Sequence, residues 1–191
     1  MKFYFHAIRI VAIAAFFLSR QLPAQGNENT LIGSRAQPWK VSDWLNSKSL
    51  ELENLKGKVV LVRWWTAPDC PFCRNTAPAL NEFYEQYHER GLEVIGFYHH
   101  KSPGPVNKKK VKKYADGFGF KFPIAIDYDW ETLKEWWLDD QERAWTSVSF
   151  LIDRTGYIRY IHPGGQYIKG DEDYARLKEM IEKLFSGISG L

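Results

Sequence analysis

The segment between Lys58 and Tyr87 constrains the fold more than any other part of this 191-residue chain. It opens with a short, β-branched apolar run from Lys58 to Trp65, which follows Lys56-Gly57 and predicts a buried strand. From Cys73 to Tyr87, apolar residues then recur at steps of three and four, the spacing of one helical face. A buried strand is therefore followed within a few residues by an amphipathic helix.

The rest of the chain continues this alternation of strands and helices. The pattern predicts a strand over 92–98, a helix over 106–118, an extended segment over 122–127, a short helix over 131–138, a hairpin of 148–153 and 157–161, and an amphipathic helix over 171–185. This order predicts an α/β fold, a mixed β-sheet with helices on both faces. Residues 31–191 contain no linker, repeat or break in composition, so we expect them to form one domain.

The charge balance argues against a nucleic-acid partner. The chain has 26 Lys and Arg against 23 Asp and Glu. Three of those bases, Lys2, Arg9 and Arg20, lie within residues 1–24, which contain no acid. Bases and acids are therefore balanced in the remainder, whereas a nucleic-acid binder needs surplus Lys and Arg to displace counterions from phosphates.

The N-terminus has the pattern of a secretory signal peptide. Lys2 and Arg9 precede an apolar run from Ile10 to Leu18, and a polar stretch with Leu22-Pro23-Ala24 follows. The run has nine residues, whereas a membrane-spanning helix needs roughly 20. We expect residues 1–24 to be removed, residues 25–30 to form a flexible leader, and the mature protein to be periplasmic or secreted without a permanent membrane anchor.

The chain has only two cysteines, in the sequence Cys70-Pro71-Phe72-Cys73, so a disulfide framework is excluded. In an oxidising compartment such a pair is a redox device or a metal clip, and a zinc site would need two further ligands. The positive end of the helix that begins here favours a thiolate on Cys70. Cys70 is therefore the expected attacking sulfur, and Cys73, one turn deeper, the sulfur that resolves a mixed disulfide.

Several segments around the cysteines resemble the thioredoxin-like superfamily, and within it the exported TlpA/ResA-type thiol-disulfide oxidoreductases, which carry a redoxin domain. The matching segments, in order, are Leu31–Trp39, Glu53–Trp65, Gly91–Gly96, Phe122-Pro123 with Asp127, and Phe150–Gly156. The resemblance covers residues 31–185. It implies a three-layer thioredoxin-like fold, redox-active Cys70 and Cys73, and no cofactor or bound metal.

Three positions depart from that family pattern. Ser147 stands where the family places a cis-proline facing the cysteines, and a non-proline cis bond costs about 2.5 to 4 kcal/mol, so we expect a trans Thr146-Ser147 bond. Arg63 stands at the position of the buried acid of thioredoxin, which removes the usual proton relay. Asp69 precedes the first cysteine, where the family commonly has tryptophan; its carboxylate disfavours a thiolate, whereas Arg63 or Arg74 would favour one.

The residues expected to contact a substrate lie around this motif. They are Trp65, Pro71, Phe72, Thr146 and Ser147. Trp65, Trp136, Trp137 and Trp145 could form an apolar platform for a partner polypeptide, although core packing is the more ordinary interpretation of each.

Other polar motifs have more ordinary interpretations. His99 and His100 end a predicted strand at the same sheet edge as the motif, either as polar caps of an exposed strand end or as acid/base or copper ligands facing Cys70. His162, before Pro163-Gly164-Gly165, is interpreted as a turn residue. The five lysines between Lys108 and Lys113 are interpreted as a solvated helix face.

These features favour an exported oxidoreductase that exchanges a Cys70–Cys73 disulfide with thiols of other exported proteins. The Pro-Phe dipeptide lacks the histidine that stabilises the thiolate in some members, which favours a reductant supplied by a membrane electron donor. One alternative is a peroxiredoxin-like thiol peroxidase, although Arg63 and Ala67 replace the Pro and Thr that position peroxide in that class. Another is a copper carrier, because soft thiolates suit Cu(I).

Overall fold

The computed structural model describes residues 31–139 and 143–187. The expected signal peptide and flexible leader lie outside these described residues. The strands are β1 (Asp43–Leu45), β2 (Val59–Trp65), β3 (Leu92–His99), β4 (Ile124–Asp127), β5 (Ser149–Ile152) and β6 (Ile158–His162). The helices are α1 (Pro71–Tyr87), α2 (Lys108–Gly117), α3 (Glu131–Leu133) and α4 (Glu172–Phe185), and a π-helical turn, Lys134–Leu138, continues α3.

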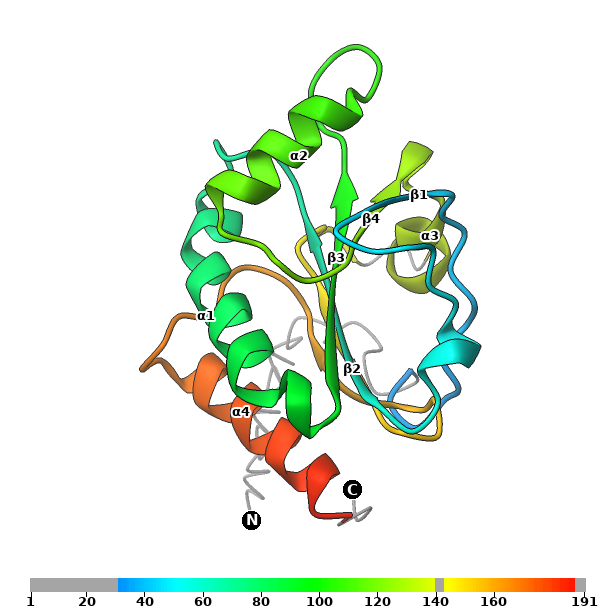
Figure 1. Ribbon diagram of the computed structural model, residues 1–191, viewed down its shortest axis with the longest axis vertical. Coiled ribbons are helices and arrows are strands. Elements are labelled where there is room, and N and C mark those ends of the chain that lie inside the picture. The colour runs from blue at the N-terminus through cyan, green and yellow to red at the C-terminus, as the bar shows by residue number, and fades with distance from the viewer. Residues whose placement is uncertain (1–30, 140–142, 188–191) are drawn as a thin grey trace, which may run out of the picture.

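The strands form one mixed sheet in the order β1-β4-β3-β2-β5-β6. The three central strands β4, β3 and β2 are parallel, and β1, β5 and β6 pair antiparallel to their neighbours. Helices α1 and α4 cover one face of this sheet and α3 covers the other (Figure 1). The α/β fold with a mixed sheet between two helical layers, predicted from the sequence, is confirmed.

Strand β2 joins the two hydrophobic cores because every one of its residues is buried. Val59, Leu61 and Trp65 pack in the core beneath α1 and α4. The alternate residues Val62 and Trp64 pack in the core beneath α3, together with the segment that precedes β2. A strand in the middle of a covered sheet must be apolar on both faces, which explains the continuous apolar run in the sequence.

Two elements differ from the sequence prediction. Strand β1 was not predicted, because it has only three residues and carries no alternating pattern of its own. The short helix expected over 131–138 consists of α3 followed by the π-helical turn. That turn buries Trp136 and Trp137 in the core beneath α3, as core packing predicts.

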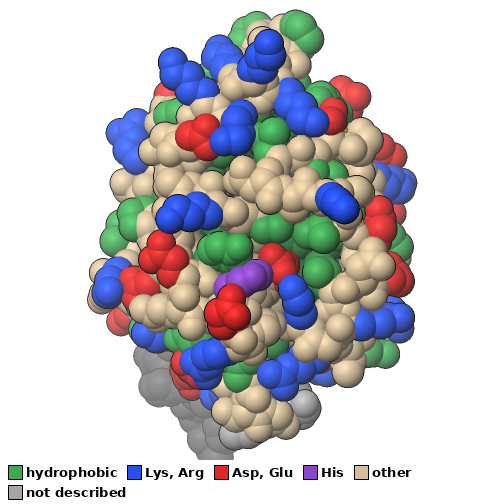
Figure 2. Space-filling model, viewed as in Figure 1, with side chains coloured by type: hydrophobic (Ala, Val, Ile, Leu, Met, Phe, Trp, Pro, Cys, Tyr) green, Lys and Arg blue, Asp and Glu red, His purple; other side chains and the backbone are tan. Residues whose placement is uncertain are grey.

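The α2 lysines lie at the surface. Lys108, Lys109, Lys110, Lys112 and Lys113 are all exposed, and Figure 2 shows Lys and Arg side chains gathered at the end of the molecule where α2 lies in Figure 1. Lys108 pairs with Asp43 of β1 and Lys112 with Asp116 of its own helix. The interpretation of this run as a solvated helix face is confirmed. Within the described residues, no helix is long and apolar enough to cross a membrane.

Asp127 ties β4 to both β2 and α3. Its buried carboxylate accepts hydrogen bonds from the Trp64 indole at 3.0 Å and from the backbone N–H groups of Thr132 and Leu133 at 3.0 and 2.8 Å. Burial raises the pKa of Asp127, although these three donors oppose the change. The carboxylate thereby caps the first turn of α3 and fixes the end of the sheet next to it.

Trp65, at the end of β2, packs in the core and not at the surface. Only 1% of it is exposed, and its ring contacts Tyr98, Phe118 and Phe120. The expectation that Trp65 contacts a substrate is therefore corrected. The ring fits because residue 96 of β3 is glycine: a Cβ atom there would lie 2.9 Å from the Trp65 indole nitrogen.

Substituting this glycine should destabilise the protein. Gly96→Ala forces the added methyl group against Trp65 and Phe122, so we expect the free energy of unfolding to fall by about 1 to 3 kcal/mol. Gly117→Ala at the end of α2 is the matched control, because a Cβ there meets nothing within 4 Å and alanine favours helix. Urea unfolding of both variants measures the difference; equal stability of the two would contradict this account of the Trp65 packing.

Candidate active site

The two cysteines lie at the beginning of α1, directly after the loop that follows β2. Cys70 is the N-cap residue, with extended backbone, and Pro71 is the first helical residue. Proline suits this position because its fixed φ matches the helix and its missing N–H would have no helical partner. Cys73 lies in the first turn and is buried, whereas Cys70 is half-buried, and both are free thiols.

The environment of Cys73 holds it in the protonated form. Burial, and then a hydrogen bond with the Cys70 sulfur, raise the pKa of Cys73 to about 12. The backbone N–H of Thr66, 3.4 Å from the Cys73 sulfur, and the Arg63 guanidinium act in the opposite direction. Cys70 is thus the more accessible sulfur, and Cys73 is the sulfur protected behind it.

A cavity of about 350 Å³ opens beside both sulfurs. It is lined by Thr66, Cys70, Pro71, Phe72, Cys73, His99, Lys101, Ala144, Trp145, Thr146 and Ser147. The structure therefore brings Pro71, Phe72, Thr146 and Ser147 together around the cysteines, as expected from the sequence. Trp65 is absent from this lining.

Thr146 and Ser147 form the wall opposite the motif. The described residues contain no cis peptide bond, so the Thr146-Ser147 bond is trans, as expected. The Ser147 hydroxyl accepts a hydrogen bond from the Gly165 N–H at 2.9 Å, and its carbonyl accepts one from Arg63. Thr146 Oγ1 lies 3.0 Å from His99 Nε2. These bonds fix the segment that replaces the proline of the family pattern.

Arg63 is completely buried at the back of this wall. Its guanidinium donates to the carbonyl groups of Ser147 and Gly165, the latter at 2.7 Å, and lies 3.4 Å from the Ser149 hydroxyl. Its central carbon is 5.3 Å from the centre of the Tyr167 ring. Burial lowers the pKa of Arg63, and Tyr167 and the two cysteines oppose that change.

His99 is not the exposed strand cap that the more ordinary interpretation assumed. It is 1% exposed and lines the cavity, with its ring packed edge-on against Trp130 at 5.2 Å. Burial lowers the pKa of His99 to about 3, and the positive charges of Lys101 and Arg63 contribute. The ring is therefore neutral at physiological pH. His100, by contrast, does not line this cavity, and its Nδ1 lies 2.9 Å from the Tyr98 hydroxyl.

Trp145 is the member of the expected tryptophan platform that reaches the surface. It is 55% exposed, and its ring packs edge-on against Phe72 at 5.5 Å. The Trp137 indole donates a hydrogen bond to the Trp145 carbonyl at 2.8 Å. Trp145 also packs closely on Gly164, where a Cβ atom would lie only 2.3 Å from the Trp145 Cβ. Phe72 and Trp145 thus form an apolar surface directly beside Cys70.

Sequence reasoning missed three contributors to the cavity. Thr66 takes part through its backbone N–H, which leaves no trace in the residue type. Lys101 and Ala144 line the cavity from loops that carry no motif. The one sequence signal for Lys101 is its position two residues after His99, the end of a strand that is parallel to the strand before the cysteines.

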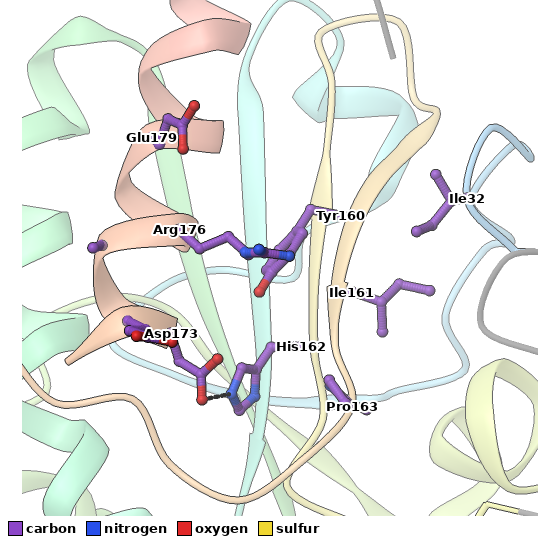
Figure 3. Close-up of a pocket in the computed structure, with 10 residues that line it drawn as sticks. Ile32, Tyr160, Ile161, His162, Pro163, Asp173, Arg176 and Glu179 are labelled. Carbon is purple, nitrogen blue, oxygen red and sulfur yellow. Dashed lines mark ion pairs between the residues drawn. The ribbon is translucent and has the colours of Figure 1, made fainter. Parts of the chain in front are cut away.

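A second cavity, of about 690 Å³, lies between β6 and α4 and shares none of its lining with the cysteine cavity. Figure 3 shows His162 directed at Asp173 of α4, and the two side chains are 3.5 Å apart. The interpretation of His162 as a turn residue is wrong: it ends β6, pairs with Ser149 of β5 and is 3% exposed. Burial and then Arg63 lower the pKa of His162, and Asp173 opposes them.

Metal ligands do not gather in the described part of the chain. No group of three or more His, Cys, Asp or Glu side chains there is arranged to hold a metal ion.

Comparison with known proteins agrees with this geometry. The sequence model of the AhpC/TSA family matches residues 32–161. Thiol-disulfide oxidoreductase ResA of Bacillus cereus is 31% identical over 157 residues, which cover 82% of this chain and 80% of that protein. Protein DipZ of Mycobacterium tuberculosis is 32% identical over 154 residues, but this chain spans only 20% of its length.

Solved structures show the same fold. A thiol-disulfide isomerase from Corynebacterium glutamicum superposes with a TM-score of 0.63 and 29% identity, covering 81% of this chain and 97% of that chain. A protein described as a DsbE-type thiol:disulfide interchange protein, from Chlorobium tepidum, gives a TM-score of 0.66 with 21% identity, covering 81% and 97%. The chain therefore belongs to the AhpC/TSA family. It has the thioredoxin-like fold, and its sequence is similar to that of the thiol-disulfide oxidoreductase ResA.

Proposed function

We propose that this chain is an exported oxidoreductase that exchanges a Cys70–Cys73 disulfide with the thiols of other exported proteins. The observation that carries the proposal is the difference between the two sulfurs. Cys70 is half-buried at the N-cap of α1 and opens onto a cavity, whereas Cys73 is buried one turn behind it. An accessible nucleophile with a protected second thiol is the arrangement that thiol-disulfide exchange requires.

The exchange takes place in two steps. The Cys70 thiolate attacks one sulfur of a partner disulfide and forms a mixed disulfide, and the partner's other sulfur leaves as a thiolate. Cys73 then loses its proton and attacks the Cys70 sulfur, which releases the second partner sulfur and leaves a Cys70–Cys73 disulfide. Burial raises the pKa of Cys73, so Cys73 must lose a tightly held proton before this second step. The reverse sequence oxidises a partner dithiol.

The surface next to Cys70 fits a polypeptide partner. Phe72 and Trp145 provide an apolar face, and Lys101 brings a positive charge to the cavity. Aromatic side chains of this kind supply large contact areas at low entropic cost. We therefore assign the partner's residues beside its cysteine to the Phe72–Trp145 surface, with Thr146 and Ser147 on the other side.

Export rests on the sequence of residues 1–24, which lie outside the described structure. Lys2, Arg9 and the apolar run Ile10–Leu18 have the pattern of a cleaved signal peptide. Exported proteins with thiols or disulfides are then the partners, and a membrane protein is the electron donor if the pair works as a reductant. The peroxidase alternative gains nothing from the structure, because Arg63 is buried in hydrogen bonds to carbonyl groups.

Trapping of partners tests the exchange and the export together. In the full chain, Cys73→Ser leaves Cys70 able to attack but removes the sulfur that resolves the mixed disulfide, so we expect adducts with exported proteins to accumulate. Cys70→Ser, the matched control, should trap at least tenfold less because its remaining thiol is buried. Non-reducing gels and mass spectrometry of the exported fraction measure both, and should place the mature N-terminus near Gln25.

Two results would contradict the proposal. Equal trapping by the two variants would reverse the assignment of nucleophile and resolving thiol. An intact Met1 terminus, with adducts confined to cytoplasmic proteins, would exclude export.

The exposed tryptophan should matter for protein partners and not for the dithiol itself. Trp145→Ala removes the side chain that packs on Phe72, so we expect kcat/KM for reduction of insulin disulfides to fall about tenfold, the loss typical of an aromatic contact at an interface. The equilibrium of the pair with glutathione should change by less than threefold. Tyr157→Ala, an exposed aromatic residue outside the cavity lining, is the control. The same loss in both variants would argue against a docking role for Trp145.

A further inference from the structure

Arg63 is a buried cation without an anionic partner. The residue is 0% exposed, and its hydrogen-bond partners, the carbonyl groups of Ser147 and Gly165 and the Ser149 hydroxyl, are all neutral. Among the described residues, no carboxylate forms an ion pair with it. Its Nε has no hydrogen-bond partner at all. Buried charges in proteins are normally paired, because an isolated charge in a low-dielectric interior is costly.

The groups near Arg63 that can carry a compensating negative charge are the Tyr167 hydroxyl and the two sulfurs. Burial raises the pKa of Tyr167, so its hydroxyl stays protonated near neutral pH and the sulfurs remain. Arg63 donates to the carbonyl of Ser147, and Ser147 lines the same cavity as Cys70 and Cys73. Three residues beyond Arg63, the backbone N–H of Thr66 donates to the Cys73 sulfur. The two sulfurs raise the pKa of Arg63, and the Arg63 charge in turn lowers the pKa of Cys73. Arg63 and Cys73 are both buried, so the interaction between them is weakly screened.

We propose that Arg63 is the counter-charge of the reduced Cys70–Cys73 pair, and that it stabilises the thiolate form over the uncharged disulfide. The inference rests on the proposed exchange function. It adds a residue that influences whether the cysteine pair oxidises or reduces its partner. We assign the negative charge to Cys70, because burial and the hydrogen bond with the Cys70 sulfur both favour a protonated Cys73. Arg63 acts through the charge on sulfur and does not touch the partner, so it is a positioning residue.

The redox balance shows why the charge matters. The reduced pair, one thiolate and one thiol, gives two electrons and one proton to a partner disulfide. With one further proton from solvent, that disulfide becomes two thiols, and the pair becomes an uncharged disulfide. The reduced state alone carries the negative charge, so a fixed positive charge favours the reduced state and makes the pair a stronger oxidant. This effect opposes the reducing tendency expected from the Pro71-Phe72 dipeptide.

Other charged and titratable groups surround the pair. They are Asp69 and Arg74 next to the motif, His99 and Lys101 in the cavity lining, and Tyr167 and His162 near Arg63. Asp69 and Arg74 are exposed, so water and salt screen their charges. His99 is neutral because burial lowers its pKa to about 3. Arg63 is therefore the one fully buried charge among them.

Two substitutions separate the charge of Arg63 from its hydrogen bonds. Arg63→Gln keeps a donor for the carbonyl groups but removes the charge, and Arg63→Lys keeps the charge but loses the forked geometry. We expect the equilibrium constant for reduction of the pair by glutathione at pH 7.5 to fall at least tenfold in Arg63→Gln, equivalent to about 30 mV for a two-electron couple. Arg63→Lys should stay within threefold of wild type. Arg74→Gln, an exposed arginine near the motif, is the matched control and should also stay within threefold.

The pH dependence distinguishes an electrostatic role from a structural one. The difference in this equilibrium constant between wild type and Arg63→Gln should disappear at acid pH, where the reduced pair is a neutral dithiol in both proteins. It should reach its full size at alkaline pH. Equal equilibrium constants in the two proteins, or a gap that is the same at every pH, would overturn the proposal. If Arg63→Gln does not fold, a tenfold loss in folded Arg63→Lys would overturn it as well.

The proposed function is tested independently of this measurement. Glutathione reports the equilibrium of the pair without any protein partner. Wild-type protein that fails to exchange with insulin would refute the function, whereas unchanged glutathione equilibria in the Arg63 variants would refute only the role of Arg63.

Discussion

The burial of β2 on both faces is the constraint on which the rest of the structure depends. All seven residues of the strand are buried, and they alternate between the two cores of the sheet. A charge at the centre of such a strand must find partners within reach of its own side chain. Arg63 finds neutral ones, in the carbonyl groups of Ser147 and Gly165. Those contacts anchor two loops beside the cysteines, so the same side chain shapes the site and supplies its buried charge.

The topology of the sheet determines which side chains meet at this site. Strands β2 and β3 are parallel, so the motif that follows β2 and His99 at the end of β3 lie at the same edge of the sheet, where the carboxyl ends of these strands meet. Strand β5 runs antiparallel to β2, which brings Thr146 and Ser147, just before β5, to that edge. The helix α1 then begins there, and its N-terminal N–H groups favour negative charge on the first cysteine. Sequence-distant segments thus form one cavity.

Local patterns in the sequence predicted the order of the elements and the reactive pair, because periodicity and the Cys-x-x-Cys spacing are visible without long-range contacts. They did not predict which polar and aromatic residues are buried. His99 lies in the interior because Thr146, 47 residues away, and Trp130 enclose its ring. Trp65 is in the core because Gly96 leaves space for it. In both cases the deciding partner comes from another part of the chain, which no local pattern contains.

The central claim is that the reduced pair carries one thiolate, matched to a buried guanidinium. The most direct test is the reduction potential of the wild-type protein as a function of pH around neutrality. If reduction adds two electrons and one proton, the potential should fall by about 30 mV per pH unit. A fall of about 59 mV per unit would mean that two protons accompany the two electrons, so that the reduced pair is an uncharged dithiol, and would contradict the account.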